Sequence, residues 1–350
     1  MELEYIWQEY GLDRLQEGLG ILFPESTVSL EGLLSRVMTG DVFGALAELF
    51  TGSITGFVAQ LTGLKNIFIW LLVMGIVSSL MTHFVEIFDR HQVADLGFYF
   101  MYLLFTVVLL KCFLQTAEIA AETLENIILF IRLLMPTYLL TVGISTGSVT
   151  AGASCQLMLL VIFGVEHILA KVLVPLVYSF LMLVIVNGIW AEEKLSLLIE
   201  LLEKGIGWAL KGVLGMVTAI GIFQALVTPV VDTARKAGLQ KLVAAIPGVG
   251  GAADGVVELV LGSAAVIKSS VGVVLLLLLL SLCAAPLVKI AVIAGILKCA
   301  AAFMGIVSDK RITSCADRAG DAGFLLFRTV GTAMLLFLIS VAVITASGGR

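Results

Sequence analysis

The segment Ile246-Pro247-Gly248-Val249-Gly250-Gly251 opens a hydrophobic unit that ends at Pro286-Leu287-Val288. An earlier unit, from Met135-Pro136 to Pro175-Leu176-Val177, has the same order of features. The two prolines are 39 positions apart in each unit (175 − 136 and 286 − 247), and the units are offset by 111 (247 − 136). In both, a Gly/Ser-rich stretch follows the first proline and a long apolar run precedes the second. Duplicated halves with Gly/Pro-interrupted hydrophobic segments are typical of membrane transporters, whose pathway lies at the interruptions.

Composition places the chain among membrane proteins. Of its 350 residues, 60% are hydrophobic and 13% are charged, and the mean hydropathy is +1.10. About a quarter of the residues of a soluble domain are charged. Charged residues leave long gaps, such as those between Lys171 and Glu192 and between Lys268 and Lys289. A membrane-spanning helix needs about 20 apolar residues, so these gaps are long enough to cross a bilayer and a soluble globular protein is excluded.

The apolar runs predict an all-α, polytopic membrane protein with about eight transmembrane helices. These helices cover approximately residues 66–86, 96–115, 152–174, 175–191, 206–228, 264–285, 286–305 and 323–346. New helices are expected to start at Pro175 and Pro286, because proline is tolerated at a helix start. We divide the chain into an acidic N-terminal extracytoplasmic or interfacial segment (1–64), two membrane repeats (65–175 and 176–286) and a C-terminal transmembrane pair (287–350).

The two repeats are predicted to be inverted relative to each other. Each 111-residue unit would contain three spans, and an odd number reverses the direction of the next copy. An amphipathic helix over 117–135 carries an acidic stripe, whereas its counterpart over 229–246 is basic. Because Lys and Arg prefer the cytoplasmic side, the basic helix and the segment Lys310-Arg311 are expected there together. The N-terminus is then extracytoplasmic.

The Gly/Pro-broken segments supply the candidate pathway residues. Both segments are expected to be non-helical at their centres, because glycine and proline weaken helices and exposed backbone is not tolerated against lipid. The candidates for a pathway or a helix break are Pro136, Gly143, Gly147, Gly152, Pro247, Gly250, Gly251, Asp254, Glu258 and Gly262.

Glu166 and Lys268 are the candidate buried charges. Intramembrane ionisable groups are usually paired or face water. Lys268 lies ten residues beyond Glu258, about 15 Å along a helix, so its partner is expected on another segment, with Glu166 as the best candidate. The alternative interpretation is interfacial: the lysines snorkel to the membrane surface, and Asp254 and Glu258 are ordinary helix-end charges.

Catalytic and metal-binding motifs are not recognisable in the sequence. The cysteines are dispersed without a CxxC pair, which suggests buried small side chains rather than a disulfide frame or a zinc site. No GxGxxG follows a strand and no Walker sequence occurs. No basic patch suggests a nucleic-acid partner. The sequence therefore predicts a protein that is not an enzyme, with no cofactor and no metal.

The segments around the second unit resemble a known family. Ile246 to Gly251, followed by Asp254, Leu261-Gly262-Ser263, Ile267-Lys268 and Val271-Gly272-Val273, is similar to stage III sporulation protein AE of endospore-forming bacteria. Pro286 to Ile290, Ser308 to Ile312, Cys315 and Gly320 continue the similarity, and Met135-Pro136 with its Gly/Ser stretch also fits. The resemblance covers about residues 65–350 and is most specific over 246–320.

The resemblance implies a multi-pass protein of the mother-cell membrane around the forespore. Its partners would be the other stage III sporulation membrane subunits of a complex that links the two cells, and a homo-oligomer is compatible with this role. The family typically begins with a signal peptide, and Met1-Glu2-Leu3-Glu4-Tyr5 does not start one, so we expect a processed or shortened form.

Two hypotheses follow. In the first, the protein is a permease-like subunit that moves small solutes or supports their movement. In the second, it is a non-transporting membrane scaffold that assembles the complex. A third class, an intramembrane enzyme acting on lipid, is weaker because no metal or nucleophile cluster is visible.

Overall fold

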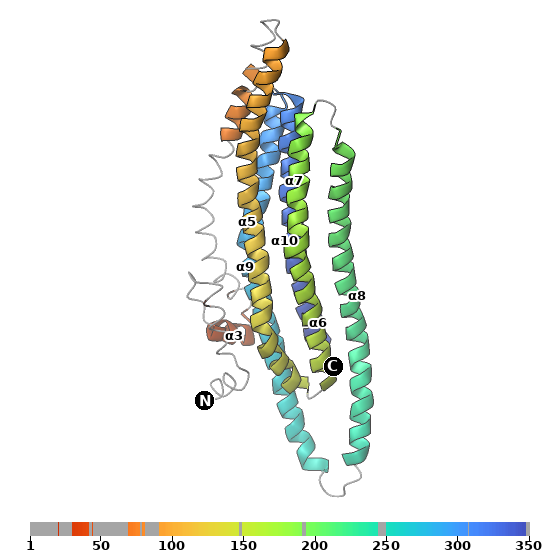
Figure 1. Ribbon diagram of the computed structural model, residues 1–350. Coiled ribbons are helices and arrows are strands. Elements are labelled where there is room, and N and C mark those ends of the chain that lie inside the picture. The colour runs from red at the N-terminus through yellow and green to blue at the C-terminus, as the bar shows by residue number, and fades with distance from the viewer. Residues whose placement is uncertain are drawn as a thin grey trace.

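The fold is a bundle of very long helices, shown by a computed structural model (Figure 1). The structure describes residues 20, 30–41, 44, 69–77, 79–80, 91–146, 149–190, 194–243, 250–306 and 308–347. Of these, only the backbone is described for 30–31, 34, 91–96, 134–146, 149–152, 225, 227–243, 250–269 and 344–347. The helices are α3 (Leu30–Met38), α5 (His91–Thr146), α6 (Val149–Ile168), the π-helical turn η1 (Leu169–Leu173), α7 (Val174–Ile189), α8 (Ser196–Val243), α9 (Gly250–Met304) and α10 (Lys310–Ser347). The regular structure within these ranges is entirely helical, which confirms the predicted all-α class.

The helices alternate in direction along the bundle. In Figure 1, α5 descends, α6 and α7 ascend, α8 descends, α9 ascends and α10 descends. The 55 residues of α9 correspond to about 82 Å at 1.5 Å per residue, whereas a bilayer's hydrocarbon core is about 30 Å thick. The longest helices therefore extend beyond the hydrocarbon core.

Five of the described helices are long and apolar enough to cross a membrane. The candidate spans are Gly97–Leu133, Ala153–Ile189, Ser196–Gln224, Ser270–Met304 and Lys310–Val343. The predicted count of eight is not confirmed, because two pairs of predicted spans are each a single helix. The predicted span 66–86 is only partly within the described residues, where 69–77 and 79–80 are helical.

The prediction that separate membrane spans start at Pro175 and Pro286 is wrong. Pro175 lies in the first turn of α7, which continues η1 without a change of direction, and Pro286 lies inside α9. The N–H of Val174, the residue before Pro175, donates a hydrogen bond to the Leu169 carbonyl. This bond joins residues five positions apart, which is the spacing of a π-helix. This wider turn accommodates a ring that would otherwise clash with a carbonyl of the preceding turn. The boundaries proposed at 175/176 and 286/287 thus fall inside continuous helices.

The predicted inversion of the repeats is also wrong. Once the chain passes straight through both prolines, the described part of each 111-residue unit contributes two long helices instead of three spans. An even number restores the direction, so α5 and α8, the corresponding first helices, both descend in Figure 1. The basic segments also separate. Residues 235–241 lie near the lower end of α8, whereas Lys310 starts α10 at the upper end.

The Gly/Pro-rich segments are helical over most of their length. Helix α5 continues through Pro136 and Gly143, and α6 includes Gly152. Helix α9 begins at Gly250 and runs on through Gly251 and Gly262. The predicted non-helical centre is therefore wrong for the second stretch, where α9 is continuous from Gly250 onward, whereas the centre of the first stretch, at 147–148, is not tested. Gly147 and Pro247 lie outside the described residues.

Helix α10 is the central element of the bundle and packs against α5, α6, α7, α8 and α9. Small residues permit its closest approach to α9. A Cβ built on Gly323 would lie 2.8 Å from the Cβ of Ala294, and one built on Gly320 would lie 2.7 Å from the Cγ of Lys298. Such small-residue contacts are a common way for membrane helices to pack without an aqueous hydrophobic effect between them.

Two of the described helices are clearly amphipathic, and for α5 this confirms the pattern predicted from the sequence. Leu33 and Val37 form the buried face of α3, which packs against α9. On α5, the predicted polar stripe of Glu118, Glu122, Glu125 and Arg132 is exposed. The opposite face is fully buried through Ala117, Ala120, Leu124, Ile127 and Ile131.

The predicted burial of the cysteines is confirmed for Cys112, Cys155, Cys283 and Cys315, and it is wrong for Cys299, which is exposed. None of the five forms a disulfide.

Candidate functional site

Glu166 lies deep inside the bundle, near the middle of its length. It follows the start of the continuous α6–η1–α7 helix by 17 residues (166 − 149) and precedes its end by 23 (189 − 166). These separations correspond to about 26 and 35 Å. The side chain has no exposed surface. The sequence predicted a buried charge at this position, and the burial is confirmed.

The carboxyl group of Glu166 has no hydrogen-bond partner. Both of its oxygens are buried and unpaired among the described residues. Burying an ionised group without a partner is among the most unfavourable arrangements in a protein. An intramembrane ionisable residue is therefore a candidate functional group by default.

The surroundings of Glu166 combine a helix irregularity with a second polarisable group. It lies three residues before η1, and single π-helical turns are frequent at functional sites. On the neighbouring α9, Cys283 is close enough for electrostatic interaction with Glu166. Cys283 precedes Pro286 by three residues, and that proline removes one backbone donor from α9. A π-helical turn on its own helix and a proline on α9 thus lie near the carboxyl group.

The outer surface near η1 is charged, in contrast to this interior. Lys171 Nζ lies 3.7 Å from Glu125 Oε1 of α5, and both side chains are mostly exposed. An exposed pair of this kind contributes roughly 0–1 kcal/mol to stability. Its position marks where the polar stripe of α5 meets the irregular part of the α6–η1–α7 helix.

The other predicted site residues are placed by their backbone alone or lie outside the described residues. Asp254, Glu258 and Lys268 belong to α9, but their side chains are outside the description. Lys268 precedes Cys283 by 15 residues (283 − 268), about 22 Å along the helix. Since Cys283 is the α9 residue near Glu166, the helix register does not favour the predicted pair between Glu166 and Lys268.

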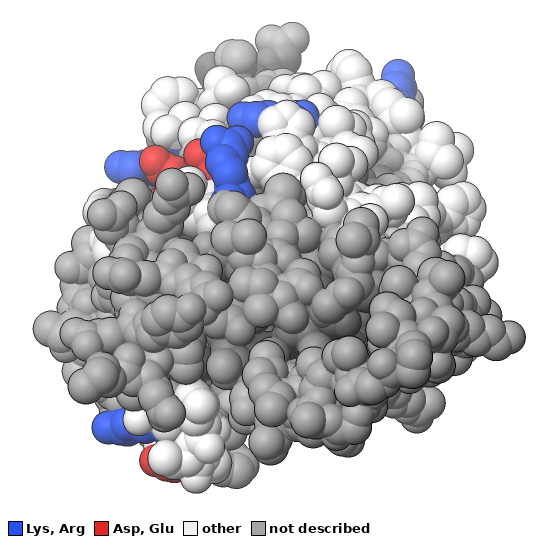
Figure 2. Space-filling view, turned by 90° about the horizontal axis from the view of Figure 1, so that it is seen from below, with Lys and Arg blue, Asp and Glu red and all other residues white. Residues whose placement is uncertain are grey.

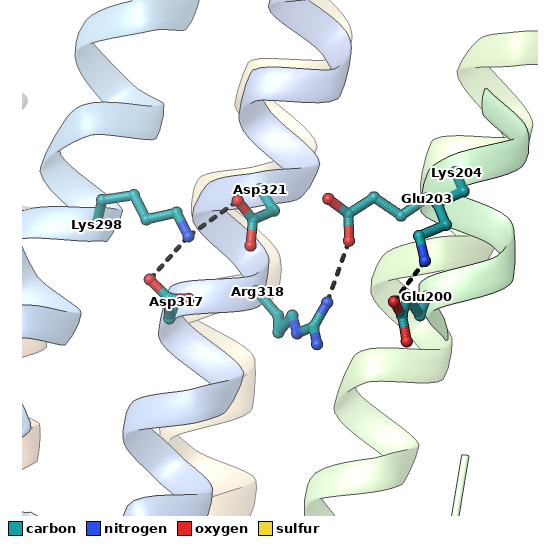
Figure 3. A network of polar contacts seen from close by, with 7 residues as sticks. All are labelled: Glu200, Glu203, Lys204, Lys298, Asp317, Arg318 and Asp321. Atoms are coloured by element: carbon teal, nitrogen blue, oxygen red, sulfur yellow. Dashed lines mark hydrogen bonds and ion pairs between the residues drawn. The ribbon is translucent and has the colours of Figure 1, made fainter. Parts of the chain in front are cut away.

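A second polar region occupies the upper end of the bundle and contains ion pairs between helices (Figure 3). Lys298 Nζ of α9 lies 2.8 Å from Asp317 Oδ1 and 2.9 Å from Asp321 Oδ1 of α10. Arg318 Nη1 lies 3.1 Å from Glu203 Oε2 of α8. These ion pairs, here called the end network, fasten three helices to one another. The same view includes the pair between Lys204 and Glu200, which are both on α8.

Neutral contacts complete this upper end. The Tyr102 hydroxyl donates a hydrogen bond to the Ile185 carbonyl over 2.7 Å and lies 3.5 Å from Cys315 Sγ. Gly188 permits this approach, since a Cβ there would overlap the Tyr102 hydroxyl. The side-chain oxygen of Asn187 accepts a hydrogen bond from the Leu195 N–H at 2.8 Å, closing the connection from α7 to α8.

The ion pairs of the end network could not be predicted from local sequence patterns. Glu203 and Arg318 are 115 positions apart, and no local spacing connects them. One signal was available within α10: Asp317 and Asp321 are four positions apart, a spacing that places both on one helix face.

The described lower surface carries few charges. Seen from below in Figure 2, charged side chains of the described residues form small groups beside larger uncharged areas. No group of three or more His, Cys, Asp or Glu side chains suited to a metal occurs among the described residues.

The chain is similar to one family over most of its length. The family model for stage III sporulation protein AE matches residues 28–348. A protein of Bacillus subtilis (strain 168) named "Stage III sporulation protein AE" is 23% identical over 265 residues, which cover 75% of this chain and 66% of that protein. The match thus spans slightly less than two thirds of the relative's length. No solved structure matches the chain.

Proposed function

Because the chain belongs to the stage III sporulation protein AE family, we propose that it is a permease-like membrane subunit of the sporulation complex that connects mother cell and forespore. Membership of the family supports a role in sporulation, and five described helices are suited to crossing a membrane. The finer proposal is that the subunit moves small solutes, or supports their movement, without catalysing a reaction.

Glu166 is the observation that carries the permease proposal. A scaffold needs no unpaired carboxyl group at the centre of its bundle, and such a group destabilises the fold. A pathway for polar solutes does need polar groups within the apolar interior, and such groups mark solute and ion pathways in membrane proteins. The irregular helices beside Glu166 fit this role, since unpaired backbone carbonyls at a helix irregularity offer further polar contacts.

The test is neutral replacement of Glu166 in a sporulating cell. Glu166→Gln keeps the size of the side chain and removes its ability to ionise. We expect it to abolish forespore development after engulfment with the protein level unchanged. Glu122→Gln is the matched control, because Glu122 is exposed on the polar stripe of α5, and normal sporulation is expected for it. Wild-type sporulation of Glu166→Gln would contradict the permease proposal.

Asp254 and Glu258 are proposed to act in the same pathway. They lie four apart on α9, hence on one face and near its start. We expect loss of sporulation for Asp254→Asn or Glu258→Gln at unchanged protein level. Wild-type sporulation of both variants would reduce them to ordinary charges near a helix end.

The proposed location is the mother-cell membrane that surrounds the forespore, and the proposed partners are the other stage III sporulation membrane subunits. An extracytoplasmic N-terminus is proposed from the acidic lead segment, in which residues 1–64 contain nine acidic and two basic side chains. A reporter enzyme that is active only outside the cytoplasm, fused to the N-terminus, tests the orientation. Activity of the fusion is expected, and an inactive but stable fusion would place the N-terminus inside.

The scaffold remains the second candidate because the end network gives three helices a firmly fixed end without any pathway. Co-purification of the complex separates the two. If Glu166→Gln leaves the subunits associated but blocks development, transport is favoured. If development is normal in Glu166→Gln and lost only in variants that dissociate the subunits, the scaffold is favoured.

A further inference from the structure

A small polar cleft opens at the upper end of the bundle, between the end of α7 and the starts of α8 and α10. Its polar lining consists of Asn187, Ser196, Arg311, Ser314 and Arg318. The remaining lining residues are apolar, glycine or cysteine, and no acidic side chain of a described residue lines the cleft. A cleft surrounded by hydrogen-bond donors and two guanidinium groups favours an anion.

Arg311 is held in place from two sides. Its guanidinium carbon lies 3.5 Å from the centroid of the Phe98 ring, a cation–π contact that fixes the plane of the group. Its Nε lies 3.3 Å from Asp309 Oδ1. This ion pair uses one nitrogen of the guanidinium, and the two terminal nitrogens have no hydrogen bond to another described residue.

Arg318 is fixed in a comparable way, about two turns further along α10. Its Nη1 lies 3.1 Å from Glu203 Oε2, and this is its single hydrogen bond within the described part of the chain. Arg311 and Arg318 are seven residues apart on α10, so they project from the same side with Ser314 between them. Each arginine therefore keeps spare N–H donors although its charge is partly balanced.

Neutral donors complete the set. The side-chain oxygen of Asn187 is occupied by the Leu195 N–H, so the group that stays available is its NH2, a pure donor. The Ser314 hydroxyl is partly exposed and has no partner among the described residues. Ser196 is the first residue of α8, whose N-terminal N–H groups are unpaired within the helix.

We propose that this cleft binds a phosphate-type oxyanion, supplied either as free phosphate or as the headgroup of an anionic lipid. A tetrahedral oxyanion offers several acceptor oxygens to donors arriving from three helices, and the planar fork of arginine matches phosphate geometry. A bound anion would join the starts of α8 and α10 to the end of α7 and so extend the end network.

Binding is tested on the purified full chain with two probes. Inorganic phosphate is titrated calorimetrically in detergent, with acetate as the carboxylate comparison. Separately, the protein is reconstituted with phosphatidylglycerol or with phosphatidylcholine, and retained lipid is identified by native mass spectrometry. We expect Arg311→Lys and Arg318→Lys each to weaken binding about tenfold or more, because lysine keeps the charge but loses the fork.

Arg328→Lys is the matched control, since Arg328 is exposed on the same helix and outside the cleft. Ser314→Ala is a second test that leaves both arginine ion pairs intact, and it is expected to weaken binding several-fold. If the wild-type protein binds inorganic phosphate and these variants do not, the ligand is a free anion. If the wild-type protein retains phosphatidylglycerol but does not bind inorganic phosphate, the ligand is a lipid headgroup. Absence of binding by both probes, equal affinity for acetate, or loss no greater than in Arg328→Lys would overturn the proposal.

Discussion

The centre and the upper end of the bundle differ in whether their ionisable side chains have partners. At the upper end, Lys298, Arg318 and their carboxylate partners are half-buried and paired across three helices. At the centre, Glu166 is fully buried and has no hydrogen-bond partner among the described residues. A buried charge without a partner lowers the stability of the fold by several kcal/mol, so pairing of buried charges is the more stable arrangement. The end network thus holds the helices together, whereas Glu166 adds no such pairing and is the residue on which the permease proposal rests.

The largest expected effect comes from removing the polar group at the centre. Glu166→Leu replaces an unpaired carboxyl group by an apolar side chain of comparable size. We expect the thermal stability of the purified protein to rise, by about 1–3 kcal/mol in the free energy of unfolding, while sporulation is lost. Stability and function then change in opposite directions. Thermal unfolding in detergent and spore counts measure the two, and lower stability in Glu166→Leu would mean that the carboxyl group has a stabilising partner.

The second prediction concerns the most connected cation of the end network. Lys298→Met leaves Asp317 and Asp321 side by side without their shared partner. Because these side chains are 29–50% exposed, solvent screens part of the repulsion, and we expect a loss of about 1–2 kcal/mol in stability. Lys289→Met is the control, since Lys289 lies on the same helix without an ion pair to a described residue. Equal stability of the two variants would show that the end network does not hold α9 to α10.

Particular residues show how far the sequence could predict this molecule. The polar stripe of α5 and the buried Glu166 were found because burial of a helix face leaves a local periodic pattern. The predicted starts of new helices at Pro175 and Pro286 failed for a physical reason. A proline signals a break only if the preceding turn cannot adjust, and η1 supplies that adjustment at Pro175. The inverted repeat failed as a consequence, because its direction depended on counting those starts.

The end network was beyond local prediction. Its ion pairs join residues of different helices, and complementary charges on α8, α9 and α10 become neighbours only after the bundle has assembled. Glu166 shows the converse limit. Its position in an apolar run was visible in the sequence, but its lack of a partner is a property of all the helices packed around it.

The third prediction measures one contact of the end network directly. A double-mutant cycle of Arg318→Ala and Glu203→Ala isolates the ion pair between α10 and α8. Both side chains are about one third exposed, so we expect a coupling energy of about 0.5–1 kcal/mol in thermal unfolding at low salt. The coupling is expected to shrink as salt is added. A coupling energy of zero at low salt would remove this contact from the network.

The smallest effect is expected at the edge of the same region. Lys204 Nζ lies 2.7 Å from Glu200 Oε1, and the side chains are 62% and 49% exposed. The distance is the shortest of the ion pairs described above, yet both residues belong to α8, so the contact fastens nothing to a second helix. Surrounding water solvates each charge nearly as well as its partner does. We therefore expect Lys204→Met to unfold at the wild-type temperature within experimental error, in the same assay that detects Lys298→Met. A loss as large as that of Lys298→Met would show that distance, rather than burial and connection between helices, sets the strength of these pairs.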